Sequence, residues 1–134
     1  MRIESRFELL PSVRRRVAAW AEGVGLSEDA VEDFVLCVHE AAMNAIEHGN
    51  RTEPSRMVTI DLEDQAGQVV ATVRDEGSGI ACPAEGEGGW LSDPAFSGRG
   101  LPTIRALMDA VVVRPDRGEI RMRLSKTGRM HGAP

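Results

Sequence analysis

Apolar residues recur at helical spacing over two segments in the first third of the chain. The first segment begins near Pro11, which suits the first turn of a helix, and reaches residue 23. The second follows Ser27, a residue type that caps helix N-termini, and carries acidic side chains in its first turn. Gly49 and Asn50 tolerate left-handed backbone and are expected to end it. The pattern predicts two consecutive amphipathic helices, at about residues 11–23 and 28–48.

Alternation with a period of two residues, which is typical of strands, occurs on both sides of these helices. Residues 2–9 alternate loosely and predict an edge strand. Residues 57–62 and 69–74 are rich in β-branched side chains, and the turn at 65–67 joins them as a hairpin. The remaining predicted elements are a short helix near residues 100–108 and two strands, at 110–113 and 119–124, around a turn at 115–118.

The predicted strands and helices are segregated along the chain and do not strictly alternate. Their order is one strand, two helices, two strands, an irregular segment, one helix and two strands. This order favours an α+β fold, a two-layer sandwich in which a mixed but mostly antiparallel sheet is covered on one face by helices. A length of 134 residues fits a single domain over residues 1–134, with a frayed tail from about residue 126.

Composition narrows the function classes. Apolar residues make up 42% of the chain and charged residues 28%, which is ordinary for a globular protein. The net charge of −5 leaves no broad basic field for a nucleic-acid backbone, so no direct nucleic-acid binding is expected. Basic residues gather at residues 14–16 and 114–129, where solvated faces are the ordinary interpretation. For residues 14–16 the alternative is contact with an acidic protein partner.

Cellular location follows from what the sequence lacks. Cys37 and Cys82 have no Cys or His neighbour at metal-ligand spacing and do not suggest a disulfide framework. The chain does not open with a charged-then-apolar signal pattern, and no apolar run approaches membrane-spanning length. These features predict a cytoplasmic protein with no membrane partner.

Three polar residues in the second predicted helix are the first candidates for chemistry. Glu40, Asn44 and His48 are spaced by four, which places them on one helix face. A carboxylate can take a proton or orient a hydroxyl, and an amide oxygen is a ligand suited to Mg²⁺. Each residue also has a structural interpretation: Glu40 as a surface carboxylate, Asn44 bonding backbone at the helix end, and His48 as a packing residue.

Two glycine-rich stretches supply the second set of candidates. Asp75 ends a predicted strand, where its carboxylate can accept a hydrogen bond from an exocyclic amine, although an ordinary turn after a strand would look similar. The second stretch, residues 97–101, precedes a helix whose free N–H groups would attract phosphate. The irregular residues 81–99 are of a length that is usually functional or mobile. Together these segments indicate a nucleotide site.

The same residues resemble the motifs of a known superfamily. Glu40-x3-Asn44 resembles the N box of the GHKL ATPases, which share the Bergerat fold. Asp75-x-Gly77-x-Gly79 resembles their first glycine box, and Gly98-x-Gly100-Leu101 resembles the second. Within the superfamily the chain is most similar to the stand-alone bacterial anti-sigma factors that are also serine-protein kinases. The resemblance covers about residues 7–124.

The resemblance implies a kinase that uses ATP and Mg²⁺. Glu40 would be the catalytic base acting on a protein serine, and Asn44 the metal ligand. The implied partners are a sigma factor or another regulated protein and a small anti-anti-sigma (STAS-type) antagonist that is phosphorylated on serine. A flexible lid would span about residues 81–99. The implied cofactor-binding residues are Asn44, Asp75, Gly77, Gly79, Ile80, Gly98, Arg99, Gly100 and Leu101.

One departure from the family pattern supports a second hypothesis. Family members commonly carry Gly-Thr before the last strand, where the Thr assists the adenine-reading Asp, whereas this chain has Gly118-Glu119. Weakened adenine binding would favour an ATP- or ADP-binding interaction module with little or no kinase activity. The catalytic half of a histidine kinase is disfavoured because the chain has no phospho-accepting helical hairpin. The sequence leaves a two-fold homodimer open.

Overall fold

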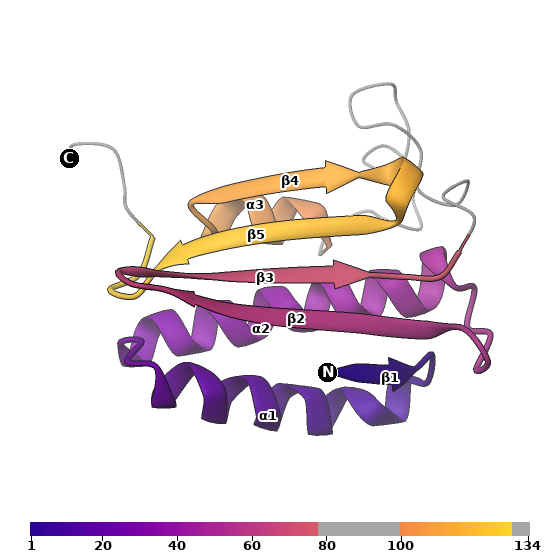
Figure 1. The fold of residues 1–134 in the computed structure, drawn as a ribbon, viewed down its shortest axis with the longest axis horizontal. Helices are drawn as coiled ribbons and strands as arrows, with labels where there is room; N and C mark the ends of the chain where they lie inside the picture. Colours follow the sequence, from indigo (N-terminus) through magenta and orange to yellow (C-terminus); the bar gives the residue numbers. More distant parts are fainter. Residues whose placement is uncertain (78–99, 130–134) are drawn as a thin grey trace.

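The computed structural model describes residues 1–77 and 100–129 of the chain. Within them, three helices lie on one face of a five-stranded sheet, as Figure 1 shows. The strand order is β1-β2-β3-β5-β4. In chain order the elements are β1 (Arg2–Glu4), α1 (Leu10–Gly23), α2 (Glu28–Asn44), β2 (Met57–Gln65), β3 (Gln68–Arg74), α3 (Leu101–Leu107), β4 (Ala110–Arg114) and β5 (Glu119–Ser125).

This architecture confirms the predicted α+β sandwich, with helices on one face of the sheet only. Sequence patterns favour a mixed but mostly antiparallel sheet, and the described strands all pair in antiparallel fashion. The reason is local connectivity, because β2 and β3, and likewise β4 and β5, are joined by turns short enough for antiparallel neighbours. The predicted lid, residues 81–99, lies outside the described residues.

The two long helices begin where their sequences predict. Pro11 occupies the first turn of α1, where its missing N–H removes no helical hydrogen bond. Ser27 caps α2, and its hydroxyl accepts a hydrogen bond from the Ala30 N–H at 3.2 Å. Glu28 and Asp29 follow in the first turn, where their charges favour the helix dipole.

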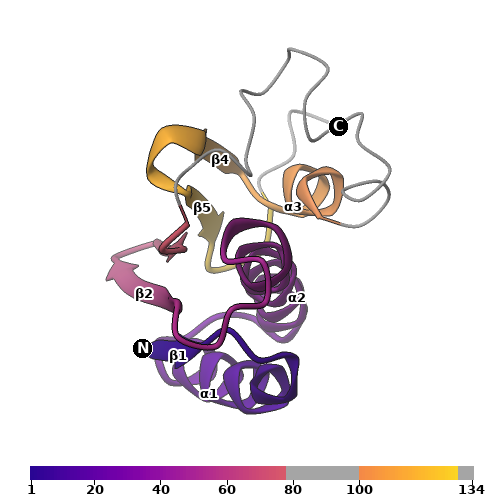
Figure 2. The ribbon, with the colours of Figure 1, turned by 90° about the vertical axis from the view of Figure 1, so that its right-hand side faces the viewer.

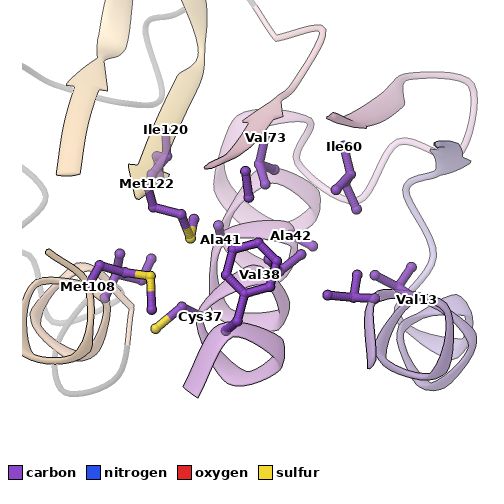
Figure 3. Close-up of a cluster of buried hydrophobic side chains, with 14 of the residues drawn as sticks. Val13, Cys37, Val38, Ala41, Ala42, Ile60, Val73, Met108, Ile120 and Met122 are labelled. Carbon is purple, nitrogen blue, oxygen red and sulfur yellow. The ribbon is translucent and has the colours of Figure 1, made fainter. Parts of the chain in front are cut away.

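The hydrophobic core lies between the sheet and the helices, with α2 at its centre (Figure 3). The inner face of α2 carries fully buried Phe34 and Val38 together with the small residues Ala41 and Ala42. Small side chains let the helix approach the sheet closely, and their neighbours fill the remaining space. Strand residues of alternating positions complete the core: Val58, Ile60, Val69, Ala71, Val73, Ile120, Met122 and Leu124.

The outer face of the sheet carries no helix among the described residues, yet Val70 and Thr72 of β3 are buried there. Long charged side chains from the neighbouring strands lie over this central strand. Exposed ion pairs of this kind contribute little to stability, but they keep the face polar. The pairs are Arg74–Asp61 at 3.2 Å, Arg74–Glu119 at 3.0 Å and Arg121–Glu63 at 3.6 Å.

The first strand is shorter than its sequence predicts. Alternation suggests a strand over residues 2–9, but β1 ends at Glu4 and a single 3₁₀ turn occupies Phe7–Leu9. Ser5 is buried and donates its hydroxyl hydrogen to the Arg56 carbonyl at 2.6 Å. This side-chain bond replaces the next step of the strand ladder, so the chain turns into α1.

The second helix ends at Gly49 and Asn50, as predicted, but its last turn is π-helical. After α2 the chain continues as a π-helical segment, Ala45–Gly49, in which the Asn50 N–H bonds the Ala45 carbonyl at 2.8 Å. The residues with left-handed backbone are Arg51 (φ 53°) and Thr52 (φ 56°), which follow Gly49 and Asn50. The buried contacts of Gly49 and Asn50, described below, hold both residues in helical conformation. The left-handed backbone that ends the helical segment therefore occurs at the exposed residues that follow.

The residues after β5 are not frayed as far as the structure describes them. The Ser27 N–H donates to the Lys126 carbonyl at 2.8 Å, and the Lys126 N–H donates to the Gly67 carbonyl at 3.0 Å. The Lys126 ammonium lies 2.7 Å from the Asp64 carboxylate. These bonds fix the turn after β5 against the start of α2 and the β2–β3 hairpin. No helix in the described part of the chain has the length and apolar character needed to cross a membrane.

Thr52→Gly is expected to stabilise the fold. A β-branched residue with positive φ is strained by about 1–2 kcal/mol, and glycine adopts this conformation without that cost. Because glycine also gains entropy in the unfolded chain, we expect a net gain of about 1 kcal/mol and a rise of a few degrees in Tm. Thermal unfolding measures it. The control is Ser55→Gly, at a nearby exposed position without positive φ, which should lower Tm; a lower Tm for Thr52→Gly would contradict the strain.

Candidate functional site

Glu40 and Asn44 lie on the central helix, α2, which runs between α1 and α3 (Figure 2). The Glu40 side chain is buried, at 5% exposure, and makes polar interactions of its own. Asn44, one turn later, is packed against Gly100, the residue before α3. A Cβ on Gly100 would come within 2.5 Å of the Asn44 Nδ2. The structure therefore places the predicted amide beside Gly100 of the predicted second glycine box, with the predicted acid one turn earlier on the same helix.

The Asn44 amide has the character of a ligand-binding group. Its Nδ2 atom is buried and has no hydrogen-bond partner among the described residues. Leaving a buried amide unpaired costs about 1–3 kcal/mol, so such a group usually serves a function or a bound species. The alternative interpretation, in which Asn44 bonds backbone at a helix end, has no counterpart among the described hydrogen bonds. Its amide oxygen suits Mg²⁺, which takes oxygen ligands and keeps several waters.

Asp75 follows β3 directly and is enclosed by three glycines. A Cβ on Gly49 or on Gly118 would overlap the Asp75 carboxylate, and a Cβ on Gly77 would overlap the Gly49 carbonyl. The Asp75 N–H donates to the Gly118 carbonyl at 3.0 Å. The Gly77 N–H donates to the Asp75 Oδ1 at 2.9 Å. The carboxylate thus lies in a cradle of backbone atoms. Only glycine fits at the three positions that form this cradle, because an added Cβ would overlap neighbouring atoms.

The electrostatics of Asp75 follow from this enclosure. Burial raises the pKa of the Asp75 carboxyl, while the Gly77 N–H and the charge of Arg56 lower it in part. Because the pKa is higher in the folded than in the unfolded chain, the ionised carboxylate makes the folded state less stable. This penalty is fully present above the folded pKa and is lost as the pH falls below the unfolded value. A destabilising carboxylate in a cradle is a candidate for binding a hydrogen-bond donor.

The two halves of the candidate site are joined by the helix itself. Asn44 and Gly49 are five residues apart on one continuous helical segment, a rise of about 7 Å. Asn44 contacts Gly100 and Gly49 contacts Asp75. The end of α2 therefore lies between the exit of β3 and the start of α3, at the right of Figure 1.

Three residues of this site were not among the sequence candidates. Gly49 and Gly118 form two sides of the Asp75 cradle, and Asn50 bonds the peptide after Asp75. Gly118 has φ 58°, a left-handed conformation that favours glycine. Because Gly118 follows Pro-Asp-Arg, the sequence predicts a turn and its left-handed conformation. The sequence does not predict the contact of Gly118 with Asp75. Gly49 and Asn50 likewise read only as a helix end.

Glu119 occupies the position where the resemblance would place a Thr. Its carboxylate lies 3.0 Å from the Arg74 Nε and 3.9 Å from the Arg114 Nε, on the outer face of the sheet. This pairing directs Glu119 away from the role that a Thr would have beside Asp75. Among the described contacts, the groups that hydrogen-bond the Asp75 side chain and N–H are backbone groups of Gly77 and Gly118.

The structure describes some of the other residues near the site, and the rest lie outside the described residues. Glu47 is half-exposed, as expected for a solvent-facing carboxylate. His48 is mostly buried and its Nε2 lies 3.5 Å from the Glu47 Oε1, which agrees with a packing role. Gly77 packs against Gly49 and Gly100 against Asn44, and Leu101 is buried. The predictions for Gly79, Ile80, Gly98, Arg99 and the lid lie outside the described residues.

The basic residues 14–16 lie on α1, on the helical side of the molecule. Arg15 and Arg16 are exposed. Arg14 crosses to α2, and its Nη1 lies 3.0 Å from the His39 Nδ1. Burial and the Arg14 charge both lower the pKa of His39. The neutral His39 ring can then accept the hydrogen bond from Arg14. Arg14 is therefore bound to the residue that precedes Glu40 in α2, and it is not a freely solvated side chain.

Residues 1–77 and 100–129 contain no group of three or more His, Cys, Asp or Glu side chains that could hold a metal ion by themselves. A single amide ligand such as Asn44 is compatible with an ion held mainly by phosphate oxygens and water. The fit of a nucleotide rests on the unpaired amide and on the glycine-lined positions beside it.

Comparison with known proteins agrees with this arrangement. Residues 3–124 match the histidine kinase-like ATPase domain. An anti-sigma F factor of Geobacillus thermodenitrificans is 33% identical over 124 residues, which cover 87% of this chain and 82% of that protein. The anti-sigma F factor of Oceanobacillus iheyensis is 34% identical over 110 residues, covering 78% and 75%. That of Clostridium botulinum (strain Eklund 17B / Type B) is 29% identical over 117 residues, covering 84% and 82%.

The fold, the site and the match define the class first: this is a histidine kinase-like ATPase domain of the GHKL type, which implies ATP binding. Its relatives define the group within that class. The chain belongs to the family of anti-sigma F factors, the regulators of partner-switching systems.

Asp75→Asn is expected to abolish nucleotide selectivity and to raise thermal stability. The amide removes the penalty of the buried charge, so Tm at neutral pH should rise above that of the unmodified chain, and the difference should disappear below the unfolded pKa. Loss of a charge-assisted hydrogen bond should weaken ATP binding about 10- to 100-fold. Calorimetric titration and thermal unfolding at several pH values measure both. Exposed Asp116→Asn is the matched control and should change neither quantity.

Gly49→Ala separates helix propensity from the contact with Asp75. Alanine is favoured over glycine in helices by about 1 kcal/mol, so propensity alone predicts a more stable protein. The added Cβ overlaps the Asp75 carboxylate, and overpacking of this kind costs about 1–3 kcal/mol. We expect a lower Tm and at least about tenfold weaker ATP binding. Gly23→Ala, at the end of α1 with no atom within 4 Å of the new Cβ, should leave ATP binding unchanged; stabilisation by Gly49→Ala would contradict the contact.

Proposed function

We propose that this protein is a serine-protein kinase that binds ATP with Mg²⁺ and phosphorylates a serine of a small STAS-type anti-anti-sigma antagonist. In the unphosphorylated state that antagonist would compete for the protein and release a bound sigma factor, or another regulated protein. The relatives named as anti-sigma F factors support the sigma factor as the regulated partner. A homodimer stays a prediction.

The observation that carries the proposal is the placement of Glu40 and Asn44. Glu40 is buried, and Asn44 lies one turn later on the same helix, packed against Gly100 at the start of α3. The Asn44 Nδ2 atom is buried and has no hydrogen-bond partner among the described residues. A helix with only a packing role would not be expected to bury an amide N–H group without a partner, as the described residues do at Asn44, because an unpaired buried polar group destabilises the fold. Phosphoryl transfer needs such groups at fixed positions, since it depends on positioning and charge stabilisation more than on covalent chemistry.

Each residue of the site has a proposed role. Glu40 accepts the proton of the substrate serine hydroxyl or orients that hydroxyl for attack. Asn44 supplies the protein oxygen ligand for Mg²⁺. Gly100, which packs against Asn44, and the adjacent Leu101 are proposed to bind the phosphates. Magnesium bound there would neutralise charge on the phosphate oxygens.

The base is proposed to be selected at the other end of the helix. The cradled Asp75 carboxylate accepts a hydrogen bond from the exocyclic amine of adenine, which guanine does not present at that position. Gly77 is proposed to let the backbone approach the ring, and the resemblance assigns Gly79 and Ile80 to cofactor binding as well. Gly98 and Arg99 are proposed to close over the phosphates.

A second function is favoured by one observation, the pairing of Glu119 with Arg74 at the position expected to hold a Thr. Without a Thr hydroxyl, adenine would be bound by Asp75 with backbone support only. The chain would then be an ATP- or ADP-binding interaction module with little or no kinase activity. The two functions differ in whether serine is labelled, and not in whether nucleotide binds.

Glu40→Gln tests the kinase against the module. The purified chain is incubated with radiolabelled ATP, Mg²⁺ and a STAS-type antagonist encoded in the same genome. We expect label on an antagonist serine, and a rate at least about 100-fold lower for Glu40→Gln, because general-base catalysis contributes at least this factor. ATP affinity should stay within about threefold.

The control for this experiment is Glu47→Gln, which removes a half-exposed carboxylate from the same helical segment and should keep full activity. Full activity of Glu40→Gln would exclude the base role. Tight ATP binding by the unmodified chain with no label on the antagonist would favour the interaction module.

A further inference from the structure

Asn50 is the most completely buried polar side chain near the site, with no exposed surface. It stands directly after the π-helical segment that follows α2. Neither the motifs nor the proposed chemistry gives it a role. A buried amide is expensive unless all its groups are paired, so its partners show what it does.

The amide of Asn50 is fully used. Its Nδ2 donates to the Ser5 Oγ at 2.8 Å and to the Met57 carbonyl at 2.9 Å, and its Oδ1 accepts from the Glu76 N–H at 2.8 Å. The partners fix which end of the amide is oxygen, because a carbonyl can only accept and a peptide N–H can only donate. One side chain thus ties the β1 end, the β2 start and the chain after β3 together.

The bond to Glu76 acts on the backbone of the candidate nucleotide site. The Glu76 N–H belongs to the peptide unit that contains the Asp75 carbonyl, so holding it fixes the backbone rotation that follows the Asp75 side chain. Gly77, on the far side, donates its N–H to the Asp75 Oδ1. Gly49, the residue before Asn50, packs on the same carboxylate.

Glu76 is held from a second direction. Its Oε1 accepts the Met57 N–H at 2.6 Å, and its Oε2 lies 2.7 Å from the Arg2 Nη2. The Met57 N–H bond is the larger cause that lowers the pKa of Glu76, followed by the bond from Arg2. These contacts are exposed and contribute little alone, whereas the Asn50 bond to the Glu76 N–H is partly buried.

We infer that Asn50 is a positioning residue for base recognition: through the Glu76 peptide it aims the Asp75 carboxylate at the exocyclic amine of adenine. The inference rests on the proposed ATP binding. Asn50 touches no nucleotide atom in this role, and it acts only through the peptide that carries Asp75. A residue that merely stabilised the fold would change the folded fraction but not the preference of the folded protein among bases.

The test measures that preference. Dissociation constants for ATP and for inosine triphosphate, which lacks the exocyclic amine, are determined with Mg²⁺ by calorimetry at a temperature well below each Tm. The ratio of the two constants does not depend on the folded fraction. For Asn50→Ala, which removes the acceptor for the Glu76 N–H, we expect the ATP preference to fall about tenfold through weaker ATP binding, with inosine triphosphate affinity unchanged.

Two variants keep the acceptor and serve as matched controls. Ser5→Ala removes a partner of the Nδ2 donor together with the Ser5 bond to the Arg56 carbonyl, and it leaves the Asn50 Oδ1 acceptor in place. Asn50→Asp retains an oxygen for the Glu76 N–H while losing both donors. Both should lower Tm and both should keep the ATP preference. If Asn50→Ala does not fold, Asn50→Ser replaces it, since the shorter hydroxyl does not reach the Glu76 N–H.

The outcomes are distinct. A fall in ATP preference in the variants without the acceptor, with preference kept in the two controls, supports the inference. Unchanged preference in Asn50→Ala or Asn50→Ser overturns it, as does an equal loss in Ser5→Ala. Failure of the unmodified chain to bind ATP with Mg²⁺ would overturn the proposed function instead.

Discussion

The close packing of the end of α2 against the exit of β3 is the contact on which the candidate site depends. At this point Gly49 and Gly118 have no Cβ, and a side chain on either would overlap the Asp75 carboxylate. The π-helical segment Ala45–Gly49 brings the helix backbone to this position, and insertions of this kind are common at functional sites. Because the same helix carries Glu40 and Asn44, this one contact sets the relation between the two halves of the site.

The hydrophobic core stabilises this arrangement of helix and sheet, whereas the polar groups of the candidate site destabilise it. Apolar and small residues on the inner face of α2 pack against the sheet. Because protein interiors are close-packed, this contact fixes the position of the helix relative to the sheet. Against this stand a carboxylate whose burial raises its pKa and an amide with an unpaired Nδ2 among the described residues. Groups that destabilise the folded chain and persist on a rigid element are the usual sign of a binding site.

Polar networks do different work on the two sides of the molecule. The ion pairs across the outer face of β3 are exposed and weak, and they keep that face polar. The Asn50 network is buried and fully paired, and it joins three segments far apart in the sequence. A buried network of this kind has one low-energy arrangement, because each unpaired member would be costly. It is therefore suited to hold the backbone around Asp75 in a single position.

The sequence alone determined the two-layer α+β architecture, both long helices with their caps, and the choice of Glu40, Asn44, Asp75 and Gly100 as candidates. Helix and strand periods, N-caps and glycine motifs are local signals, so they can be read without coordinates. The end of β1, the left-handed residues 51 and 52, and the turn after β5 were decided by contacts between distant segments. The same holds for the roles of Gly49, Asn50 and Gly118: each reads locally as a turn or helix-end residue, and only tertiary packing places it against Asp75 or the peptide that follows it. Burial and pairing are properties of the assembled fold, and no spacing along the chain specifies them.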